Sequence, residues 1–202
     1  MSDTGSNTHE PGDNRARWEA RYLDRGSELD RVASTWIVER SVALPEGAVV
    51  LDVAGGTGRN AAPVARSGRV VVLADFVEQA VAAAVRRHPR ILGVVADAGA
   101  LPFRAAAFDA VIVVSYLDRS AFKVFAALLK PGGTLLYETF TRAHIEVVAR
   151  GRARGPTNPA YLLEPGELSR LVAPLELQEH EERLVVDEAG ERHVARVMAR
   201  RA

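Results

Sequence analysis

The chain contains no cysteine among its 202 residues, which excludes disulfide bonds, thiolate metal sites and a cysteine nucleophile. No hydrophobic run approaches the roughly 20 residues of a membrane-spanning helix, and the polar N-terminus has no apolar segment of signal-peptide type. Lysine plus arginine and aspartate plus glutamate number 26 each, so the net charge is zero and no broad affinity for nucleic acid is indicated. We therefore expect a cytoplasmic protein without a nucleic-acid or membrane partner.

The histidines are too scattered to indicate a metal site. No two of them stand at the i, i+4 spacing of a helical zinc site; they are His9, His88, His144, His180 and His193. The chain also has no Gly-x-Ser-x-Gly sequence, which the nucleophile elbow of a serine hydrolase requires. We expect neither a bound metal nor a Ser-His-Asp mechanism.

The composition fits one domain with a sizeable core, because 48% of the residues are apolar. Residues 1–14 are polar and are expected to be a disordered tail, which leaves 15–202 as a single domain. Apolar runs bounded by turn residues predict strands at 49–53, 69–74, 91–96, 110–115, 134–140, 175–186 and 192–200. Helical spacing predicts helices at 58–66, 78–88, 121–129, 143–150 and 167–172.

Two further helices are predicted before the first strand. The first ends near Tyr22 and carries Trp18 and Tyr22 on one face, either as a packing surface or as a cover over a ligand. The second follows Ser27-x-x-Asp30, which has the form of a capping box, and continues at helical spacing to about Val42.

A strand, a glycine-rich turn and a helix start follow one another at Val49 to Asn60. Glycine lets a ligand approach the backbone closely, and the helix start offers unpaired N–H groups. The carboxylate of Asp52 at the strand end would repel a pyrophosphate and attract a cationic amino group. The loop alone remains ambiguous, because Gly56-x-Gly58-x-x-Ala61, with Asp75 about 20 residues on, also fits a dinucleotide-binding fingerprint.

The sequence Asp52-x-x-x-Gly56-x-Gly58 resembles motif I of the class I S-adenosylmethionine-dependent methyltransferases, although Ala54 replaces the first glycine of the usual pattern. The segment 97–103, Asp-Ala-Gly-Ala-Leu-Pro-Phe, resembles the part of these enzymes that reads the adenine edge. Leu-Lys-Pro-Gly-Gly at 129–133 is a further likeness. Dinucleotide-dependent enzymes have no obligatory counterpart of the 97–103 segment, so it favours the methyltransferase interpretation.

The resemblance implies S-adenosylmethionine as cofactor and assigns roles to the acids after the first three strands. Asp52 would hold the amino end of the methionine part, Asp75 would accept hydrogen bonds from both ribose hydroxyls, and Asp97 would accept from the adenine amine. The residues expected to bind the cofactor are Asp52, Ala54, Gly56, Gly58, Asn60, Asp75, Phe76, Asp97, Ala98 and Ser115.

The implied fold is α/β and Rossmann-like: a doubly wound sheet of seven strands, with the last strand antiparallel and helices on both faces. The 140–165 segment shows little regular pattern and leaves the sheet edge where the cofactor would bind. Long irregular connections at such a place are commonly lids or binding loops, so we predict a lid here.

Three residues near the strand ends are candidates for catalysis: Tyr116, Glu138 and His144. His144 suits a general base because the pKa of an unperturbed histidine is near neutrality. Glu138 closes a buried strand, where a carboxylate needs a partner. Tyr116 follows the fourth strand at the end where ligands bind in open α/β sheets.

The 158–168 segment resembles a stretch of the tellurite-resistance-like branch of small-molecule methyltransferases, Asn-Pro-x-aromatic-Leu-Leu-x-Pro-Gly-Glu-Leu. This implies a small acceptor, such as a thiol, a chalcogen oxyanion or another soft nucleophile. Several arginines crowd the predicted lid and would steer an anionic acceptor; they are Arg142, Arg150, Arg152 and Arg154.

The sequence thus predicts methyl transfer from S-adenosylmethionine to a small molecule. Two alternatives stay open. A dinucleotide-dependent oxidoreductase fits the glycine loop but not the 97–103 segment, and a non-catalytic protein that binds S-adenosylmethionine would retain the same cofactor residues. The sequence predicts neither the acceptor nor the oligomeric state.

Overall fold

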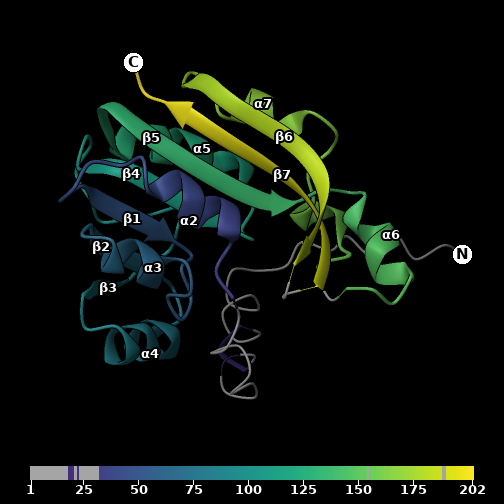
Figure 1. Ribbon diagram of the computed structural model, residues 1–202, viewed down its shortest axis with the longest axis horizontal. Coiled ribbons are helices and arrows are strands. Elements are labelled where there is room, and N and C mark those ends of the chain that lie inside the picture. Colours follow the sequence, from purple (N-terminus) through teal and green to yellow (C-terminus); the bar gives the residue numbers. More distant parts are fainter. Residues whose placement is uncertain (1–17, 21, 23–31, 154, 188–189) are drawn as a thin grey trace, which may run out of the picture.

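A computed structural model describes residues 18–20, 22, 32–153, 155–187 and 190–202. The protein is built around one seven-stranded sheet with the strand order β3-β2-β1-β4-β5-β7-β6 (Figure 1). The strands are β1 (Val49–Val53), β2 (Val70–Asp75), β3 (Ile91–Val95), β4 (Phe108–Val114), β5 (Leu129–Phe140), β6 (Glu176–Asp187) and β7 (Gly190–Arg200). The predicted tail at 1–14 and the predicted capping box at 27–30 lie outside the described residues.

Six strands run parallel, and β7 runs against both of its neighbours. β1 pairs in parallel with β2 and β4, β2 with β3, and β4 with β5. β7 is antiparallel to β5, where Tyr137 lies opposite Val197, and it is antiparallel to β6. This arrangement confirms the predicted doubly wound sheet, and it brings the carboxyl ends of β1 to β5 to one edge.

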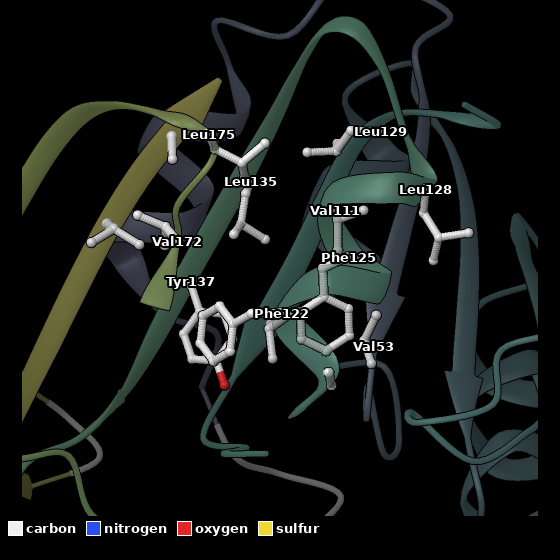
Figure 2. Packing of buried hydrophobic residues seen from close by; sticks show 14 of the residues in the cluster. Val53, Val111, Phe122, Phe125, Leu128, Leu129, Leu135, Tyr137, Val172 and Leu175 are labelled. Atoms are coloured by element: carbon white, nitrogen blue, oxygen red, sulfur yellow. The ribbon is translucent and has the colours of Figure 1, made fainter. Parts of the chain in front are cut away.

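Helices cover both faces of the sheet: α2 (Thr35–Ser41), α3 (Ala61–Arg66), α4 (Glu78–Arg87), α5 (Phe122–Leu128), α6 (His144–Ala149) and α7 (Glu167–Leu171), with the 3-10 turns η2 (Arg119–Ala121) and η3 (Pro159–Tyr161). Successive strand residues point to opposite faces, so Val50 packs with α2, α3 and α4 while Leu51 packs with α5. Figure 2 shows Phe122 of α5 beside Tyr137, with ring centroids 4.8 Å apart. No helix within the described ranges is long and apolar enough to cross a membrane.

The helix before the first strand begins later than predicted. Val32 and Ala33, which the apolar spacing places in the helix, are not helical, and α2 begins at Thr35. Ser34 is its N-cap, and the Ser34 hydroxyl accepts from the backbone N–H of Ile37 at 3.4 Å. The Ser34 N–H donates to the Asn60 side chain at 2.9 Å instead of to a helical carbonyl. Tertiary contacts at Ser34 therefore set this boundary.

β5 begins earlier than predicted, at Leu129 instead of residue 134. Leu129 pairs with Phe108 of β4, so the 130–133 segment that is predicted to end the preceding helix belongs to the strand. Gly132 has φ +75°, which glycine adopts without steric cost. Lys130 Nζ lies 2.8 Å from the Asp109 carboxylate, and this ion pair fixes the turn against β4.

Candidate functional site

The three acids predicted to form the site follow or end three adjacent strands. Asp52 is in β1, Asp75 ends β2, and Asp97 follows β3. Asp52 and Asp75 are 1% and 4% exposed, whereas Asp97 is exposed. Burial is the largest cause that raises the pKa of Asp52, and the charge of Asp75 raises it further. Burial and Asp118 raise the pKa of Tyr116 most, and Asp97 and Asp75 add smaller contributions. Because β1, β2 and β3 are parallel neighbours, the three acids lie at the carboxyl edge of the sheet.

Asp52 is a buried carboxylate whose charge is only partly compensated. Burial raises its pKa from 3.8 to about 7, while the Arg59 guanidinium and the backbone N–H of Ala61 lower the pKa. Its Oδ2 atom is buried and has no hydrogen-bond partner among the described residues. A buried carboxylate oxygen without a donor costs free energy. Asp52 is therefore prepared for a cationic donor.

Asp75 is held rigidly between the glycine loop and α4. Its Oδ2 atom accepts the N–H of Gly56 at 2.9 Å, and its Oδ1 atom accepts the N–H of Val77 at 2.9 Å. Burial raises the pKa of Asp75, and the backbone N–H groups of Val77, Gly56 and Phe76 counteract the rise. Each carboxylate oxygen offers two lone pairs, so the three N–H groups leave Asp75 one acceptor position for a further donor.

The glycine loop contains three residues with left-handed backbone: Ala54 at φ +51°, Gly56 at φ +55° and Gly58 at φ +83°. A Cβ on Gly56 would lie 2.5 Å from the Tyr22 hydroxyl, so Tyr22 covers the loop closely. A Cβ on Gly58 would instead lie 3.2 Å from side-chain atoms of both Ala84 and Ile91. Gly56 thus permits close approach on the side of the site, and Gly58 permits close packing in the core.

Trp18 and Tyr22 lie on the same side of the N-terminal segment, with ring centroids 6.0 Å apart, as the helical spacing predicts. Because the Tyr22 hydroxyl lies directly over Gly56, the interpretation as a cover over the loop gains support over that of a simple packing face. The hydroxyl adds a polar group next to the backbone that borders the Asp75 carboxylate.

Arg59 is a basic residue of the site that sequence reasoning missed. Its Nη2 atom donates to the Ser115 hydroxyl at 3.2 Å and its Nη1 atom donates to the Val32 carbonyl at 3.5 Å. Burial raises the pKa of Asp52, and the charge of Arg59 lowers it in part. Ser115 has φ +59°, a strained backbone for a residue other than glycine. Arg59 stands next to the predicted loop in the sequence, but its side chain is directed by Ser115, which follows β4 and is distant in sequence. The structure therefore adds a cation beside the predicted acid.

Asn60 is buried and has a structural contact. Its Oδ1 atom accepts the Ser34 N–H at 2.9 Å, which joins the start of α3 to the start of α2. The side chain makes no cap bond to α3 itself. The predicted contact of Asn60 with a cofactor remains a prediction.

The segment after β3 and the end of β4 form the outer part of the site. Asp97 accepts the Gly99 N–H at 2.8 Å, and Ala98 is buried beside it. Tyr116 is half-buried; burial, Asp118 and Asp97 raise its pKa, so its hydroxyl stays protonated at neutral pH. Tyr116 therefore suits a hydrogen-bond donor better than a base. Within the described residues, no group of three or more potential ligand side chains is arranged to hold a metal ion.

Glu138 is a buried carboxylate with hydrogen-bond donors at Oε2 and an ion pair, but no hydrogen bond from the described residues, at Oε1. It is 1% exposed, and its Oε2 atom accepts from the Ser34 hydroxyl at 2.9 Å and from Arg196 Nε at 2.7 Å. Arg192 Nη1 lies 3.5 Å from the Oε1 atom. Glu138 thus connects β5, β7 and the start of α2, and its predicted catalytic role remains a prediction.

His144 is enclosed by protein. The residue is 0% exposed, its ring lies 4.6 Å from that of Phe140, and its Nδ1 atom accepts the His193 N–H at 3.3 Å. Gly155 packs so closely on the ring that a Cβ there would collide with Nε2. Figure 1 shows α6, which begins at His144, at the opposite end of the molecule from α4. A base role for His144 would require this packing to open.

The predicted lid at 140–165 is folded against the end of β5 in its described part. The Leu163 N–H donates to the Phe140 carbonyl at 3.0 Å, and the Arg142 N–H donates to the Leu163 carbonyl at 2.9 Å. Leu162 and Leu163 are fully buried. The Asn-Pro pair of this segment starts η3, because Asn158 Oδ1 accepts the N–H of Ala160 at 3.0 Å.

Arg119 fastens the same segment to the β4–α5 connection. Its guanidinium donates to the carbonyls of Ala160 and Leu162 at 3.1 and 3.0 Å and to Glu167 at 2.6 Å. The other arginines of the segment are paired with glutamates: Arg142 with Glu164 at 3.2 Å, Arg150 with Glu146 at 3.2 Å and Arg152 with Glu191 at 3.4 Å. Arg154 lies outside the described residues. The three described arginines therefore offer little uncompensated charge to steer an anion.

Comparison with known proteins points to methyltransferases. The family model described as a methyltransferase domain matches residues 50–133. The demethylmenaquinone methyltransferase of Clavibacter sepedonicus is 38% identical over 132 residues, which cover 61% of this chain and 52% of that protein. One similar solved structure carries the description "Conversion of a Disulfide Bond into a Thioacetal Group during Echinomycin Biosynthesis". It superposes with a TM-score of 0.74 at 20% sequence identity, and the match covers 93% of this chain and 92% of the chain in that structure.

A second solved structure, an S-adenosylmethionine-dependent methyltransferase from Methanosarcina mazei, has a TM-score of 0.69 at 20% identity and covers 84% of this chain and 99% of its own. At such identities the structures establish the fold alone. The chain spans about half the length of the curated relatives it matches: 52% of the Clavibacter sepedonicus protein and 46% of a demethylmenaquinone methyltransferase of Renibacterium salmoninarum. The family match covers residues 50–133, which include the glycine loop, Asp52, Asp75 and Asp97. It does not include the chain from residue 134 onward.

Proposed function

We propose that this chain, whose residues 50–133 are a methyltransferase domain with the class I fold, transfers a methyl group from S-adenosylmethionine to a small-molecule acceptor. The observation that carries the proposal is the buried Asp52 oxygen without a donor, with the Arg59 guanidinium nearby. The amino-acid end of S-adenosylmethionine bears an ammonium and a carboxylate. Asp52 matches the ammonium and Arg59 matches the carboxylate by charge.

The other predicted cofactor residues support the same ligand. Asp75 retains one acceptor position after accepting from the Gly56, Val77 and Phe76 N–H groups, which suits a hydroxyl of a ribose. Asp97, beside the buried Ala98, offers a carboxylate acceptor for an adenine amine. Tyr22 lies over Gly56 and would shield the ribose side from water.

S-adenosylmethionine supplies a methyl group that its sulfonium already activates, so the work of the chain is orientation and exclusion of water. Asp52 and Arg59 would fix one end of the cofactor and Asp75 its middle. The Tyr116 hydroxyl, which stays protonated and is hydrogen-bonded to Asp118, would turn from Asp118 to donate a hydrogen bond to an acceptor atom near the end of β4. Glu138 and His144 would act from buried positions that the described packing closes.

The acceptor is a neutral small molecule in this proposal. Carboxylates dominate the site, since Asp75, Asp97 and Asp118 all act on Tyr116, while the described arginines of the 140–165 segment are paired. Such a field disfavours a chalcogen oxyanion and permits a neutral thiol or a phenol. The name of the relatives, demethylmenaquinone methyltransferase, makes a hydroxylated quinoid ring a reasonable acceptor to test.

Isothermal calorimetry with S-adenosylhomocysteine tests the cofactor assignment, and NAD and NADP are the matched negative ligands. Binding of S-adenosylhomocysteine alone is expected, whereas binding of NAD or NADP would favour an oxidoreductase. Labelled S-adenosylmethionine incubated with thiols, phenols, reduced quinones and tellurite then tests the transfer. Tight cofactor binding without a labelled product across this panel and a metabolite extract would favour a non-catalytic binding protein.

A further inference from the structure

The connection from β4 to α5 runs past the proposed cofactor site and is attached at both of its ends. At its start, the Ser115 N–H donates to the Glu138 carbonyl at 2.8 Å, and the Ser115 hydroxyl accepts from Arg59 at 3.2 Å. At its end, Asp118 is the N-cap of η2, and its carboxylate accepts a backbone N–H of that turn at 2.8 Å. Tyr116 lies between these two attachments.

Tyr137 of β5 contacts this connection from inside the core. Its side chain is fully buried, and its hydroxyl donates to the Tyr116 carbonyl at 2.7 Å. Its ring stacks on Phe122 at the start of α5, with ring centroids 4.8 Å apart. In Figure 2 the Tyr137 hydroxyl points away from Leu129 and Leu175, which lie at the other end of the cluster. One side chain therefore contacts both the connection before η2 and the helix after it.

The Tyr116 backbone lies outside the strand ladder and is bonded to a side chain instead. Val114 is the last residue of β4 that pairs with β5. The next residue, Ser115, has φ +59°, a left-handed backbone that ends the extended conformation of the strand. The Tyr116 carbonyl then accepts from the Tyr137 hydroxyl in the place of a backbone N–H. The course of the chain at Tyr116 is thus set by a hydrogen bond from the core.

The Tyr116 side chain lies beside two acids of the site. A Cβ on Gly99 would lie 3.3 Å from Asp97 Oδ1 and 3.9 Å from Asp118 Oδ2, so both carboxylates lie next to Gly99. Burial and Asp118 raise the pKa of Tyr116 most, Asp97 adds a smaller contribution, and the Tyr116 hydroxyl is hydrogen-bonded to Asp118. The place of this hydroxyl depends on the backbone that carries it, and Tyr137 holds that backbone at the carbonyl.

We propose that Tyr137 is a positioning residue, which acts through the Tyr116 carbonyl to hold the Tyr116 hydroxyl at the acceptor side of the site. This rests on the proposed function, in which the Tyr116 hydroxyl donates to the methyl acceptor. Ser115 and Asp118 have hydrogen bonds of their own. Loss of the Tyr137 hydroxyl should therefore displace Tyr116 and leave the cofactor contacts in place, which separates turnover from cofactor affinity.

Tyr137→Phe removes the hydroxyl and keeps the ring that stacks on Phe122. The affinity for S-adenosylhomocysteine, measured by calorimetry, should stay within about twofold of that of the unmodified chain. Transfer of label from S-adenosylmethionine to the thiols, phenols and reduced quinones of the panel should fall about tenfold in kcat, because small displacements of an orienting group are costly in rate.

Ser41→Ala is the matched control. The Ser41 side chain is also buried, and its hydroxyl also donates to a backbone carbonyl, that of Val38 at 2.8 Å. It belongs to α2, which packs on the face of the sheet opposite to α5. Ser41→Ala should therefore leave both the affinity and kcat unchanged, whatever it does to the melting temperature.

Fluorine NMR adds a readout that needs no methyl acceptor. The chain contains four tyrosines, so labelling with meta-fluorotyrosine gives few resonances, and Tyr116→Phe identifies that of Tyr116. Tyr137→Phe should move the Tyr116 resonance, whereas Ser41→Ala should not. In a Tyr116→Phe background, Tyr137→Phe should have little further effect on kcat, because both substitutions remove the action of the same hydroxyl.

The proposal is overturned if Tyr137→Phe leaves either the Tyr116 resonance or kcat unchanged, or if it weakens cofactor binding as much as it lowers kcat. Additive effects of Tyr116→Phe and Tyr137→Phe on kcat would also overturn it, because independent contacts add. A failure of the proposed function is distinguishable from these results. The unmodified chain would then bind no S-adenosylhomocysteine or methylate no member of the panel, while the Tyr116 resonance would still report whether Tyr137 positions Tyr116.

Discussion

Asp52→Asn is expected to stabilise the ligand-free protein above neutral pH and to weaken cofactor binding, so one substitution moves the two properties in opposite directions. Burial raises the pKa of Asp52 from 3.8 to about 7, with Arg59 opposing and Asp75 adding to the rise. The ionised carboxylate is therefore unfavourable in the fold. An amide of nearly the same shape removes the charge and also the partner of the proposed ammonium.

The magnitude follows from the two pKa values. Because the pKa is higher in the folded than in the unfolded state, the folded protein binds the extra proton, and stability is lost as the pH rises from about 4 to about 7. At about 1.4 kcal/mol per pKa unit, the full effect is about 4 kcal/mol. Between pH 5 and pH 8 the loss amounts to about 2–3 kcal/mol. Asparagine does not titrate, so the variant lacks this loss.

Urea unfolding of both proteins at several pH values between 5 and 8 measures the effect. The stability difference should grow in favour of Asp52→Asn by about 2–3 kcal/mol across this range and level off above pH 7. Asp109→Asn is the control. Burial raises the pKa of Asp109, but the hydrogen bonds from Lys130 and from the Val49 N–H lower it more, so the net pKa is below the ordinary value. This carboxylate stays ionised throughout, so its removal should destabilise the protein by an amount independent of pH.

A stability difference between Asp52→Asn and the unmodified chain that does not change from pH 5 to pH 8 would refute a pKa near 7 for Asp52. A variant that binds S-adenosylhomocysteine as tightly as the unmodified chain would refute the contact between Asp52 and the ammonium. The two results are independent, because the first concerns the ligand-free protein and the second concerns the ligand.

Three further outcomes are expected. The affinity for S-adenosylhomocysteine should rise with pH up to about 7 as Asp52 ionises, and calorimetry that finds it constant from pH 5 to 8 would contradict this. Asp75→Ala should weaken that affinity by about tenfold to a hundredfold, through loss of a charge-assisted hydrogen bond; an unchanged dissociation constant would remove Asp75 from the site. Ala54→Gly should stabilise the chain by about 0.5–1 kcal/mol. The left-handed backbone costs alanine about 1–2 kcal/mol in the folded state, and the greater conformational entropy of glycine in the unfolded state offsets part of this gain. Urea unfolding checks the last, with Ala106→Gly, at φ +53°, as a comparison.

Much of the fold was predictable because local pattern and global structure agree. The apolar runs of β1, β2 and β4 are largely buried and are interrupted in the sequence only by Asp52 in β1, by Asp75 at the end of β2 and by Asp109 near the start of β4. The glycine loop and the acids at the strand ends have the spacing that the sheet requires, and β1, β2 and β3 are parallel neighbours, so Asp52, Asp75 and Asp97 lie at one edge of the sheet; their shared role in binding a cofactor stays a prediction. Boundaries were predicted less well, since Ser34 and Leu129 are placed by distant partners.

The rest of the site depends on contacts between residues far apart in sequence, which no local pattern contains. Arg59 gains its role from Ser115, 56 positions away, and Glu138 from Ser34, 104 positions away. The need for a partner at Glu138 was predictable from burial, but the identity of that partner was not. His144 illustrates the same limit, because nothing in its local sequence predicts that its side chain is fully buried in the fold.

The order of the last two strands has a consequence for synthesis of the chain. β6 is joined to the sheet only through β7, which is made after it and which enters between β5 and β6. On the ribosome, β6 therefore emerges before the strand that connects it exists. A product that stalls before β7 would leave the backbone of β6 without a strand to pair with, while Leu177, Leu184 and Val186 of β6 are exposed even in the complete fold.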